Sequence, residues 1–356
     1  MEISVIVTCL MGQGTFEAKL IPLANSPLIN RIIVLRKIIG PPINKVEYIK
    51  LPRICRINVF NLLITPLLLI YHTKKNKVDL ILSYHFIPHA IFAFIASFFT
   101  KVPYNVTQTG LYIERYARMK KHRSYILGIL NRSLFINVPG YNSKEFWVKN
   151  GIEESKIYIL HSKIDTRVFK PGYSKKHFDF IYLGRLSKEK RVNLIVQGIY
   201  KLKNHGLNVK LAIVGDGPEM KELKKLTHIL NLNEDVTFTG FVKDPASWFN
   251  KAKIFLLCSE SEALPTALMQ AMSCKLIVIA PNIGNISCLV ENNHNGYLFD
   301  VDDISSFYEL MKEVYINYYS LIHITENARK KILLEYTHEN ATIIWNEIIK
   351  SKFIIT

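Results

Sequence analysis

Short apolar runs alternate with longer amphipathic stretches through the second half of this 356-residue chain. The apolar runs predict strands at residues 178–183, 210–214, 236–241, 254–259 and 276–280. The stretches between them predict helices at residues 189–203, 218–230, 264–272 and 285–291, with a shorter helix starting at Asp244-Pro245. Continuous apolar strands separated by helices indicate a parallel sheet that is covered on both faces, as in a doubly wound α/β domain.

The first half shows the same alternation less regularly. It predicts strands at residues 3–9, 31–35, 78–83, 104–107 and 135–138, and helices at residues 16–24 and 89–99. A second doubly wound α/β domain follows from this pattern, and the turn-like segment 164–174 predicts the junction. We therefore expect a first domain at residues 1–165 and a second at residues 166–340. A last helix within residues 341–356 is expected to pack back on the first domain.

Composition narrows the class of protein. Apolar residues make up 49% of the chain and charged residues 21%, which excludes a disordered or collagen-like chain. No apolar run reaches the roughly 20 residues of a membrane-spanning helix. The start of the chain lacks a basic segment and predicts a first strand, not a signal peptide. Five cysteines without a Cys-x-x-Cys pair favour a reducing compartment and no structural metal, so we expect a cytoplasmic protein.

The formal charge of +17 is concentrated in the first half of the chain. Residues 1–170 hold 24 Lys or Arg against 9 Asp or Glu, whereas residues 171–356 hold 22 against 20. Basic residues lie beside tyrosines at Arg115, Arg118, Lys120, Lys121 and Arg123, and Lys74, Lys75 and Lys77 follow an apolar stretch. This pattern suits an anionic membrane surface or an anionic lipid-linked acceptor. A solvated basic face is the alternative. A nucleic-acid-binding protein is a remote one, because the sequence contains no known nucleic-acid-binding motif.

Candidate chemistry follows the predicted strands, because ligands of open α/β sheets bind at the carboxyl ends of the strands. Gly184, Arg185 and Lys190 follow the strand at 178–183, and two cations there suit an anion such as a diphosphate. Glu262 and Gln270 follow the strand at 254–259, at the start of a helix whose free N–H groups can hold an anion. Solvated cations, a capping carboxylate and an ordinary helical glutamine are the alternative interpretation.

Other motifs exclude several enzyme classes. Gly12 and Gly14 follow the first strand, but Glu17 stands where a dinucleotide-binding fingerprint has its third glycine. The chain has neither a phosphate-binding loop of the Gly-x-x-x-x-Gly-Lys type nor a Gly-x-Ser-x-Gly nucleophile elbow. His85 and His89 flank Pro88 without a further metal ligand nearby, so we expect no metal site.

The second half resembles the retaining glycosyltransferases of family 4, over about residues 164–299. The matching pieces, in the order that the family has them, are Ile164-Asp165 with Phe169-Lys170-Pro171, Leu183-Gly184-Arg185-Leu186 with Glu189-Lys190, Val214-Gly215-Asp216-Gly217-Pro218-Glu219, Thr239-Gly240-Phe241-Val242, Ser259 to Met272, and Asn295-Gly296-Tyr297-Leu298-Phe299. The resemblance implies the GT-B fold, which consists of two Rossmann-like doubly wound domains facing a central cleft.

The resemblance also implies roles for the matching residues. Arg185 and Lys190 would bind and stabilise the donor diphosphate, and Glu262 would contact hydroxyls of the transferred sugar. The implied donor-site residues are Gly12, Gly14, Gly184, Gly215, Phe241, Val242, Leu264, Pro265, Thr266 and Gln270. His85, Thr109, Arg115 and Arg118 are the candidates for an acceptor or sugar pocket. No cofactor or metal is implied, because the two cations would do the work of Mg²⁺.

The sequence departs from the family pattern at several positions. Gln270 replaces a glutamate that holds the ribose, Lys275 and Ile277 replace a usual Gly and Pro, and Cys288 replaces a usual Glu. Thr107-Gln108-Thr109-Gly110 stands where a Thr-x-His-Gly segment is common, so Thr109 takes the place of the histidine and His85 is expected to supply the imidazole.

We expect transfer of a sugar, with retention at the anomeric carbon, from a UDP- or GDP-sugar to an acceptor hydroxyl. The product would belong to cell-surface polysaccharide or lipid-linked glycan assembly, with the enzyme peripheral on the inner face of the cytoplasmic membrane. A nucleotide-sugar-processing enzyme of the same fold, or an inactive subunit, is the alternative.

Overall fold

The computed structural model describes residues 2–9, 11, 13–161 and 163–354, with the backbone alone at residues 13–15 and 56. The chain forms two compact units. Unit 1 comprises Met1–Lys163 and His338–Thr356, and unit 2 comprises Ile164–Thr337. The chain therefore passes between the units twice.

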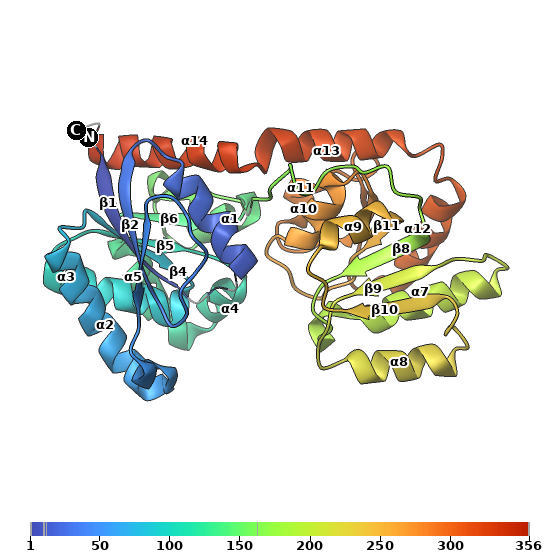
Figure 1. Cartoon of the computed structure of the whole chain (residues 1–356), viewed down its shortest axis with the longest axis horizontal. Coiled ribbons are helices and arrows are strands. Elements are labelled where there is room, and N and C mark those ends of the chain that lie inside the picture. Colours follow the sequence, from blue (N-terminus) through green and yellow to red (C-terminus); the bar gives the residue numbers. More distant parts are fainter. Residues whose placement is uncertain (1, 10, 12, 162, 355–356) are drawn as a thin grey trace. The chain divides into compact units, whose positions relative to one another are not determined.

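Unit 1 contains a seven-stranded parallel sheet of order β3-β2-β1-β4-β5-β6-β7 (Figure 1). Its strands are β1 (Ile3–Thr8), β2 (Ile29–Arg36), β3 (Val46–Lys50), β4 (Leu80–Tyr84), β5 (Tyr104–Thr107), β6 (Phe135–Val138) and β7 (Ile157–Ile159). Its α-helices are α1 (Gln13–Ala24), α2 (Asn58–Lys75), α3 (Ile91–Thr100), α4 (Tyr112–Arg118), α5 (Lys120–Arg132), α6 (Tyr141–Lys149) and α14 (His338–Ile349). Short helices are η1 (Arg53–Arg56), η2 (Phe86–Ala90), η3 (Glu154–Lys156) and η5 (Lys350–Ile354).

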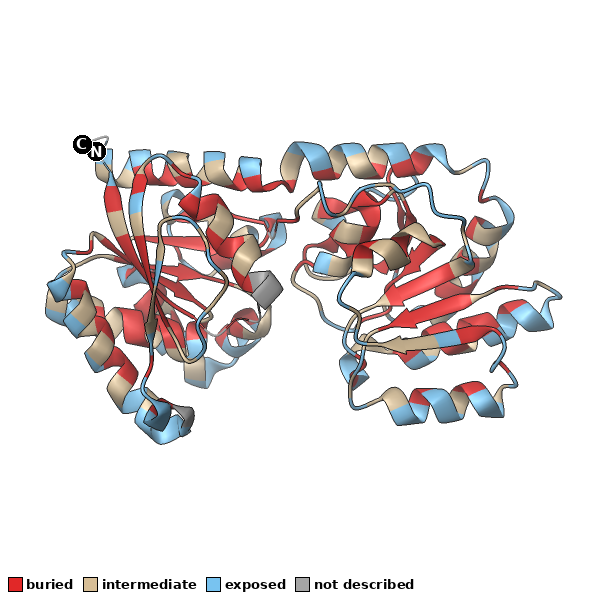
Figure 2. Ribbon diagram, in the orientation of Figure 1, coloured by how far each residue is buried: buried red, intermediate tan, exposed pale blue. Residues whose placement is uncertain are grey.

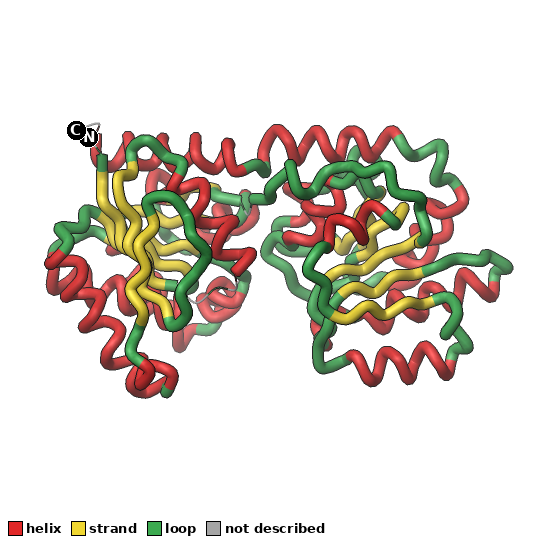
Figure 3. The backbone as a smooth tube through the Cα atoms, in the orientation of Figure 1, coloured by secondary structure: helices red, strands yellow, loops and turns green. Residues whose placement is uncertain are grey.

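Helices cover both faces of this sheet (Figure 3). Side chains alternate between the faces of a strand, so neighbouring residues of β1 enter different cores. Val5 and Val7 pack with residues of α1 and α14, whereas Ile6 packs with residues of α2, α3 and α5. Helix α14 is fixed by Trp345, whose ring lies 6.2 Å from that of Phe135. The last helix of the chain is thus part of unit 1.

Unit 2 contains a six-stranded parallel sheet of order β10-β9-β8-β11-β12-β13. Its strands are β8 (Phe178–Leu183), β9 (Leu211–Val214), β10 (Val236–Gly240), β11 (Ala252–Leu256), β12 (Ile277–Pro281) and β13 (Tyr297–Phe299). Its helices are η4 (Lys188–Lys190), α7 (Val192–Asn204), α8 (Met220–Ile229), α9 (Pro245–Asn250), α10 (Thr266–Ser273), α11 (Ile286–Leu289), α12 (Ile304–Ile316) and α13 (His323–Glu335). The strands are largely buried, and the helices bury one face each (Figure 2).

The strand orders define where ligands should bind. In unit 2 the chain builds outward from β8 to β10 and then returns to the other side of β8 with β11. In unit 1 it builds outward from β1 to β3 and returns with β4. Ligands of doubly wound sheets bind at the carboxyl ends of the strands where the order reverses. The loops after β8 and β11, and those after β1 and β4, are therefore the expected ligand sites.

Three local expectations from the sequence are wrong. The helix expected at 189–203 is interrupted, because Arg191 adopts a left-handed conformation with φ of 51° between η4 and α7. Pro218 lies two residues before α8 and is not its first residue. Helix α1 begins at Gln13, which places Gly14 inside the helix and not in a preceding loop.

Candidate functional site

The loops after β8, β9 and β10 are joined at the carboxyl end of the sheet of unit 2. The backbone N–H of Gly184 donates to the carbonyl of Val214 at 3.0 Å, and that of Leu186 donates to Asp216 at 2.9 Å. Gly215 donates in turn to the carbonyl of Gly240 at 2.9 Å. A side chain at Gly215 would place its Cβ 1.9 Å from the carbonyl oxygen of Gly184, so only glycine permits this contact.

The loops after β8 and β11 are joined by an ion pair between two predicted site residues. The Nζ of Lys190 lies 2.5 Å from Oε1 of Glu262, and the Ser259 hydroxyl donates to the same oxygen at 2.9 Å. Both charged side chains are mostly buried, at 23% and 12% exposure. A backbone bond from Glu260 to the carbonyl of Glu189, at 2.9 Å, holds the same two loops together.

The environments of Lys190 and Glu262 differ from the sequence-based expectation. Lys190 belongs to η4 and not to the first turn of α7. Glu262 does not cap α10, because Pro265 occupies the N-cap position and no side chain caps the helix. The alternative interpretation of Glu262 as an ordinary helix cap is therefore wrong.

Arg185 is the exposed cation of the site. Its backbone carbonyl accepts a hydrogen bond of 2.9 Å from Tyr182 Oη, which fixes the turn after β8. Its guanidinium has no hydrogen-bond or ion-pair partner in the part of the chain that the structure describes. The strand order of unit 2 reverses between β8 and β11, and we call this place its switch point; the corresponding place in unit 1 lies between β1 and β4. An exposed, partner-free guanidinium beside the switch point is available to an anionic ligand.

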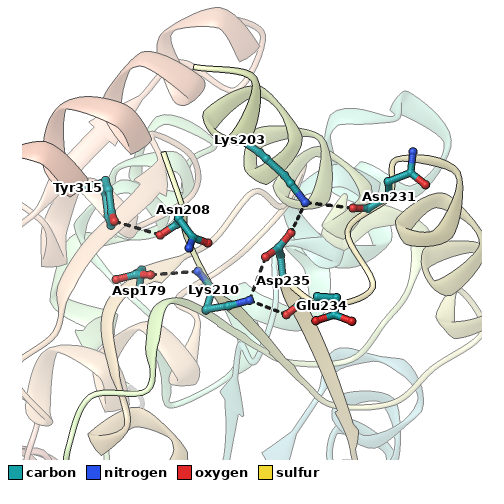
Figure 4. Close-up of polar contacts among 8 residues, drawn as sticks. All are labelled: Asp179, Lys203, Asn208, Lys210, Asn231, Glu234, Asp235 and Tyr315. Atoms are coloured by element: carbon teal, nitrogen blue, oxygen red, sulfur yellow. Dashed lines mark hydrogen bonds and ion pairs between the residues drawn. The ribbon is translucent and has the colours of Figure 1, made fainter. Parts of the chain in front are cut away.

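At the opposite end of the sheet of unit 2, lysines form ion pairs that stabilise the structure. Asp235 lies just before β10 and receives Lys203 Nζ at 2.6 Å and Lys210 Nζ at 3.0 Å (Figure 4). Burial alone would raise the pKa of Asp235, but these two lysines outweigh it and lower the pKa. Asp179 in β8 accepts the backbone N–H of Lys210 at 3.0 Å. These cations at the amino end of the strands form ion pairs within the protein, whereas Arg185 at the carboxyl end forms none with the described residues and acts through its charge on the pKa of exposed Glu189.

The remaining predicted donor-site residues surround these loops. Leu264 and Pro265 are buried before α10, Thr266 is its exposed first residue, and Gln270 is half-buried in its second turn. Phe241, just after β10, is 81% exposed, while Val242 packs partly on the core. A hollow of about 170 Å³ nearby is lined by Ser187, Lys188, Val192, Asn193, Glu219 and Leu223. It contains none of the predicted site residues.

The switch point of unit 1 carries histidines. His85 directly follows β4 with φ of 74°, and its Nδ1 lies 2.9 Å from the carbonyl oxygen of Tyr84. His89 lies on η2, its ring centroid is 6.4 Å from that of His85, and its Nδ1 lies 2.8 Å from the hydroxyl of Thr8 at the end of β1. Burial, with the charges of His85 and Lys37, lowers the pKa of His89 to about 3, so this ring is neutral.

A buried lysine that the sequence analysis missed faces this cluster. Lys19 on α1 is 8% exposed and has no ion-pair or hydrogen-bond partner among the described residues. Burial lowers its pKa to about 8. Burial and the charge of Lys19 both lower the pKa of His85, against the raising effect of the Tyr84 carbonyl. The sequence spacing could have indicated this burial. Lys19 lies on the same face of α1 as Phe16, Leu20 and Leu23, which are buried.

The other predicted residues of unit 1 do not join the histidines. Gly12 lies outside the described residues. Thr109 hydrogen-bonds the side chain of Tyr112, and the guanidinium of Arg118 lies 4.9 Å from the ring of Phe146. Arg115 is exposed, and in the described part of the chain no hydrogen bond or ion pair links either arginine to His85.

Gln108, which directly precedes the position of the missing histidine, is held inside unit 1. Its amide donates to Glu114 at 2.6 Å and accepts from the indole of Trp147 at 2.7 Å. The side chain is 4% exposed. Gln108 is therefore engaged in the core of unit 1.

Two doubly wound parallel units in one chain, with charged residues at the switch point of the second, define the GT-B class of glycosyltransferase folds. Residues 163–331 match the family model described as "Glycosyl transferases group 1". This confirms the family resemblance and the fold that the sequence predicts.

Similar proteins agree with this assignment. The chain is 25% identical over 215 residues to the capsular polysaccharide biosynthesis glycosyltransferase CapM of Staphylococcus aureus, covering 60% of this chain and 54% of CapM. It is 29% identical over 190 residues to the UDP-Gal:alpha-D-GlcNAc-diphosphoundecaprenol alpha-1,3-galactosyltransferase of Escherichia coli, covering 52% of this chain and 49% of that protein. The chain thus spans about half the length of these curated relatives. The crystal structure of Anabaena HepE in complex with UDP and glucose superimposes with a TM-score of 0.80 at 17% identity, over 98% of this chain and 100% of HepE.

Two further features concern membranes and metals. None of the helices in the described part combines the length and apolarity needed to cross a bilayer. The same residues contain no group of three or more His, Cys, Asp or Glu side chains that could hold a metal ion.

Proposed function

We propose that the protein is a retaining glycosyltransferase that moves a sugar from a UDP- or GDP-sugar to an acceptor hydroxyl. One observation carries the proposal: the loops after β8 and β11, at the switch point of unit 2, carry Arg185 and the Lys190–Glu262 pair, and the second loop leads into the uncapped start of α10. The family match of residues 163–331 and the UDP in the HepE structure support a nucleotide-sugar donor.

The cations would act on the leaving diphosphate. Negative charge grows on this group as its bond to the sugar breaks, so Arg185, Lys190 and the N–H groups of α10 stabilise the transition state more than the bound donor. We propose that these groups replace a divalent metal, and we expect transfer to continue in the presence of EDTA.

Glu262 would exchange partners when the donor binds. In the structure its carboxylate neutralises Lys190. A diphosphate would draw Lys190 away and leave the carboxylate to accept hydrogen bonds from the hydroxyls of the sugar. Gln270, in the second turn of α10, would contact the ribose, and exposed Phe241 and half-buried Val242 would contact the nucleobase.

The acceptor would bind to unit 1. Lys19 and His85 place positive charge and a ring nitrogen at its switch point, which suits an acceptor that carries a phosphate. The similarity to CapM and to the diphosphoundecaprenol galactosyltransferase supports a role in cell-surface polysaccharide or lipid-linked glycan assembly. We place the protein in the cytoplasm, with peripheral attachment to the inner face of the cytoplasmic membrane.

The test is nucleotide release from a panel of UDP- and GDP-sugars, with and without EDTA, followed by determination of the product anomer. Arg185→Ala should lower kcat by about 10²–10³-fold, as loss of one transition-state hydrogen-bond donor does. Lys221→Ala, which removes an exposed cation of α8, is the matched control. Activity of Arg185→Ala at the wild-type level would refute the site. Conversion of the sugar without an acceptor would instead indicate a nucleotide-sugar-processing enzyme.

A further inference from the structure

Helix α2 of unit 1 exposes an apolar stripe. Val59, Leu63, Leu67 and Tyr71 follow one another at intervals of four residues, so they lie along one side of the helix. Their exposed fractions are 64%, 61%, 64% and 54%. The opposite side of α2 packs into unit 1 through Thr65, Pro66, Leu69 and Thr73. This helix is therefore anchored on one side and apolar on its solvent side.

The stripe extends beyond α2. We define the η1–α2 surface as the exposed side chains of Ile54, Ile57, Val59, Phe60, Leu62, Leu63, Leu67 and Tyr71. The start of α2 and η1 reach past the sheet of unit 1 in Figure 1, and Figure 2 shows them largely exposed. Helix α3, which packs against α2, adds Phe98 and Phe99 at 63% and 59% exposure. An apolar surface of this extent marks an interaction site.

The charged residues of the segment that carries the η1–α2 surface are all positive. Residues 48–78 contain no Asp or Glu, while Arg53 lies in η1 and Lys74, Lys75 and Lys77 lie at the end of α2 and just beyond. The Nζ of Lys75 lies 5.5 Å from the ring centroid of Tyr71, and that of Lys101 lies 5.2 Å from the ring centroid of Phe98. The lysine stems thus lie along the apolar side chains while their charges remain at the edge.

The apolar stripe and its basic rim together favour an anionic bilayer over a second copy of the chain as the partner. In a symmetric contact between two copies, each copy would present the same lysines and arginines to the other, and no carboxylate of residues 48–78 could neutralise them. An anionic bilayer offers both an apolar interior for the stripe and negative head groups for the basic rim. Helix α2 does not qualify as a bilayer-spanning helix, which agrees with a position in the plane of the interface.

We propose that the η1–α2 surface docks unit 1 on an anionic lipid bilayer, with the apolar stripe inserted among the acyl chains and the basic residues at the head groups. The inference deepens the proposed function and rests on it for its biological role, because a lipid-linked acceptor would be presented at such a membrane. Docking itself involves neither donor nor acceptor, so it can be measured apart from transfer.

The test is flotation of the full chain with vesicles of phosphatidylcholine alone and with vesicles of phosphatidylcholine and phosphatidylglycerol in equal amounts. We expect the protein to float with the anionic vesicles and to remain unbound with the neutral ones. Binding should weaken as salt rises from about 0.1 M to about 1 M, because the Debye length falls from about 10 Å to about 3 Å. These vesicles contain no acceptor and no nucleotide sugar, so failure to float would not bear on the transferase proposal.

Two variants and a control define the surface. Leu63→Glu with Leu67→Glu should lower vesicle binding by more than about tenfold, because burial of a single leucine contributes at least that factor. Lys74→Glu with Lys75→Glu should weaken binding to anionic vesicles and reduce its dependence on salt. Leu333→Glu with Leu334→Glu replaces leucines of α13 in unit 2 that are 44% and 62% exposed, and it should bind like wild type. Equal thermal unfolding of all the variants verifies that they are folded.

Three outcomes would overturn the proposal. The first is wild-type protein that does not float with anionic vesicles at low salt. The second is a Leu63→Glu/Leu67→Glu variant that floats as well as wild type. The third is a vesicle-free dimer, measured by light scattering, that the same variant converts to a monomer, because the surface would then be covered by a second copy.

Discussion

Glu262 is the residue on which the donor-site proposal depends most. Its carboxylate contacts Lys190 and Ser259 at once, so its two roles can be separated by a change that retains an oxygen acceptor and removes the charge. In the proposed exchange of partners, Lys190 would leave this carboxylate to bind the diphosphate. The ion pair would then oppose donor binding, because it would have to be broken first.

Glu262→Gln should tighten UDP binding and slow transfer. The amide can still accept from Ser259, but it no longer holds Lys190 by charge, so we expect up to about tenfold higher affinity for UDP, or about 1.4 kcal/mol. The neutral amide is a weaker acceptor for the sugar hydroxyls than the carboxylate, so kcat should fall by at least about tenfold. Calorimetric titration with UDP and transfer assays measure the two effects. Glu260→Gln, an exposed carboxylate of the same loop, is the control, and weaker UDP binding by Glu262→Gln would contradict the exchange of partners.

Lys19 lowers the stability of unit 1 at neutral pH. A lysine whose pKa falls to about 8 on folding, from the usual 10.5, destabilises the folded state below pH 8, because the buried amine must carry a charge. Between about pH 8 and pH 10.5 the unfolded chain binds more protons than the folded chain, so the free energy of unfolding rises with pH. A residue that lowers stability at neutral pH and lies at a switch point is a candidate for ligand binding.

Lys19→Met should therefore be more stable and less active than wild type. At pH 7 we expect a gain in the free energy of unfolding on the order of 3 kcal/mol, which should shrink between about pH 8 and pH 10.5 and vanish above that range. KM for a phosphate-bearing acceptor should rise, while KM for the donor should not change. Thermal unfolding at several pH values and steady-state kinetics measure these effects. Lys50→Met, at an exposed position of β3, is the control, and an unchanged acceptor KM would remove Lys19 from the site.

At the scale of the elements, the donor site depends on how closely the ends of the strands approach one another. Gly215 has φ of 140°, and its Cα faces the carbonyl of Gly184. Gly217 is similar, because an added Cβ would lie 2.2 Å from the carbonyl oxygen of Leu186. The turn after β9 thereby supports the turn that carries Arg185.

Gly215→Ala should damage both stability and the site. Its Cβ would meet backbone, which cannot move aside without breaking the bonds between β8, β9 and β10. Gly206→Ala is the matched control, because Gly206 has φ of 76° but open space around it, so it should cost only about 1–2 kcal/mol. We expect Gly215→Ala to cost at least about 2 kcal/mol more, or roughly 4–8 °C in the unfolding temperature of a unit of this size. Equal losses in the two variants would show that the approach of the loops is not required.

The strands of both units were predictable where burial on both faces makes them continuously apolar. β5, β6 and β8 coincide with their expected bounds, and α9 begins at Pro245 with Asp244 as its N-cap, as the sequence indicates. The two edge strands of unit 1, β3 and β7, were not predicted. β3 has no buried residue, and β7 has only three residues, so neither carries the continuous apolar signal of a central strand.

The side-chain contacts of the site were less predictable than its location. The rule that ligands bind at the carboxyl ends of strands identified Arg185, Lys190 and Glu262 as candidates. The contact between Lys190 and Glu262 depends on the left-handed turn at Arg191 and on a backbone bond between two loops 71 residues apart. Lys19 was missed because a lysine on a helix is normally solvated, and only the packing of α1 shows that this one is buried.

At the scale of the whole molecule, the two units differ in what they hold at their switch points. Unit 2 places a guanidinium and an ion pair there, and unit 1 places a buried amine and two histidines. Unit 1 also carries the η1–α2 surface and most of the excess positive charge of the chain. These differences suit the proposed transfer, in which unit 2 would hold a water-soluble donor and the basic unit 1 would face a membrane-borne acceptor.

Hydrogen exchange should locate the nucleotide on one of these units. At about 100 times its Kd, UDP or GDP stabilises the bound state by about 2.7 kcal/mol, so amides that open only when the site opens should exchange up to about a hundredfold more slowly. We expect this protection at residues 184–190, 214–219 and 259–270, and little at residues 83–90 of unit 1. The nucleotide that also protects the backbone at Phe241 and Val242 identifies the base that the donor carries. Arg185→Ala should lose the protection at 184–190 at the same nucleotide concentration, which separates binding at this site from binding elsewhere. Strong protection by the nucleotide confined to unit 1 would reverse the assignment of the two units and contradict the proposed donor site.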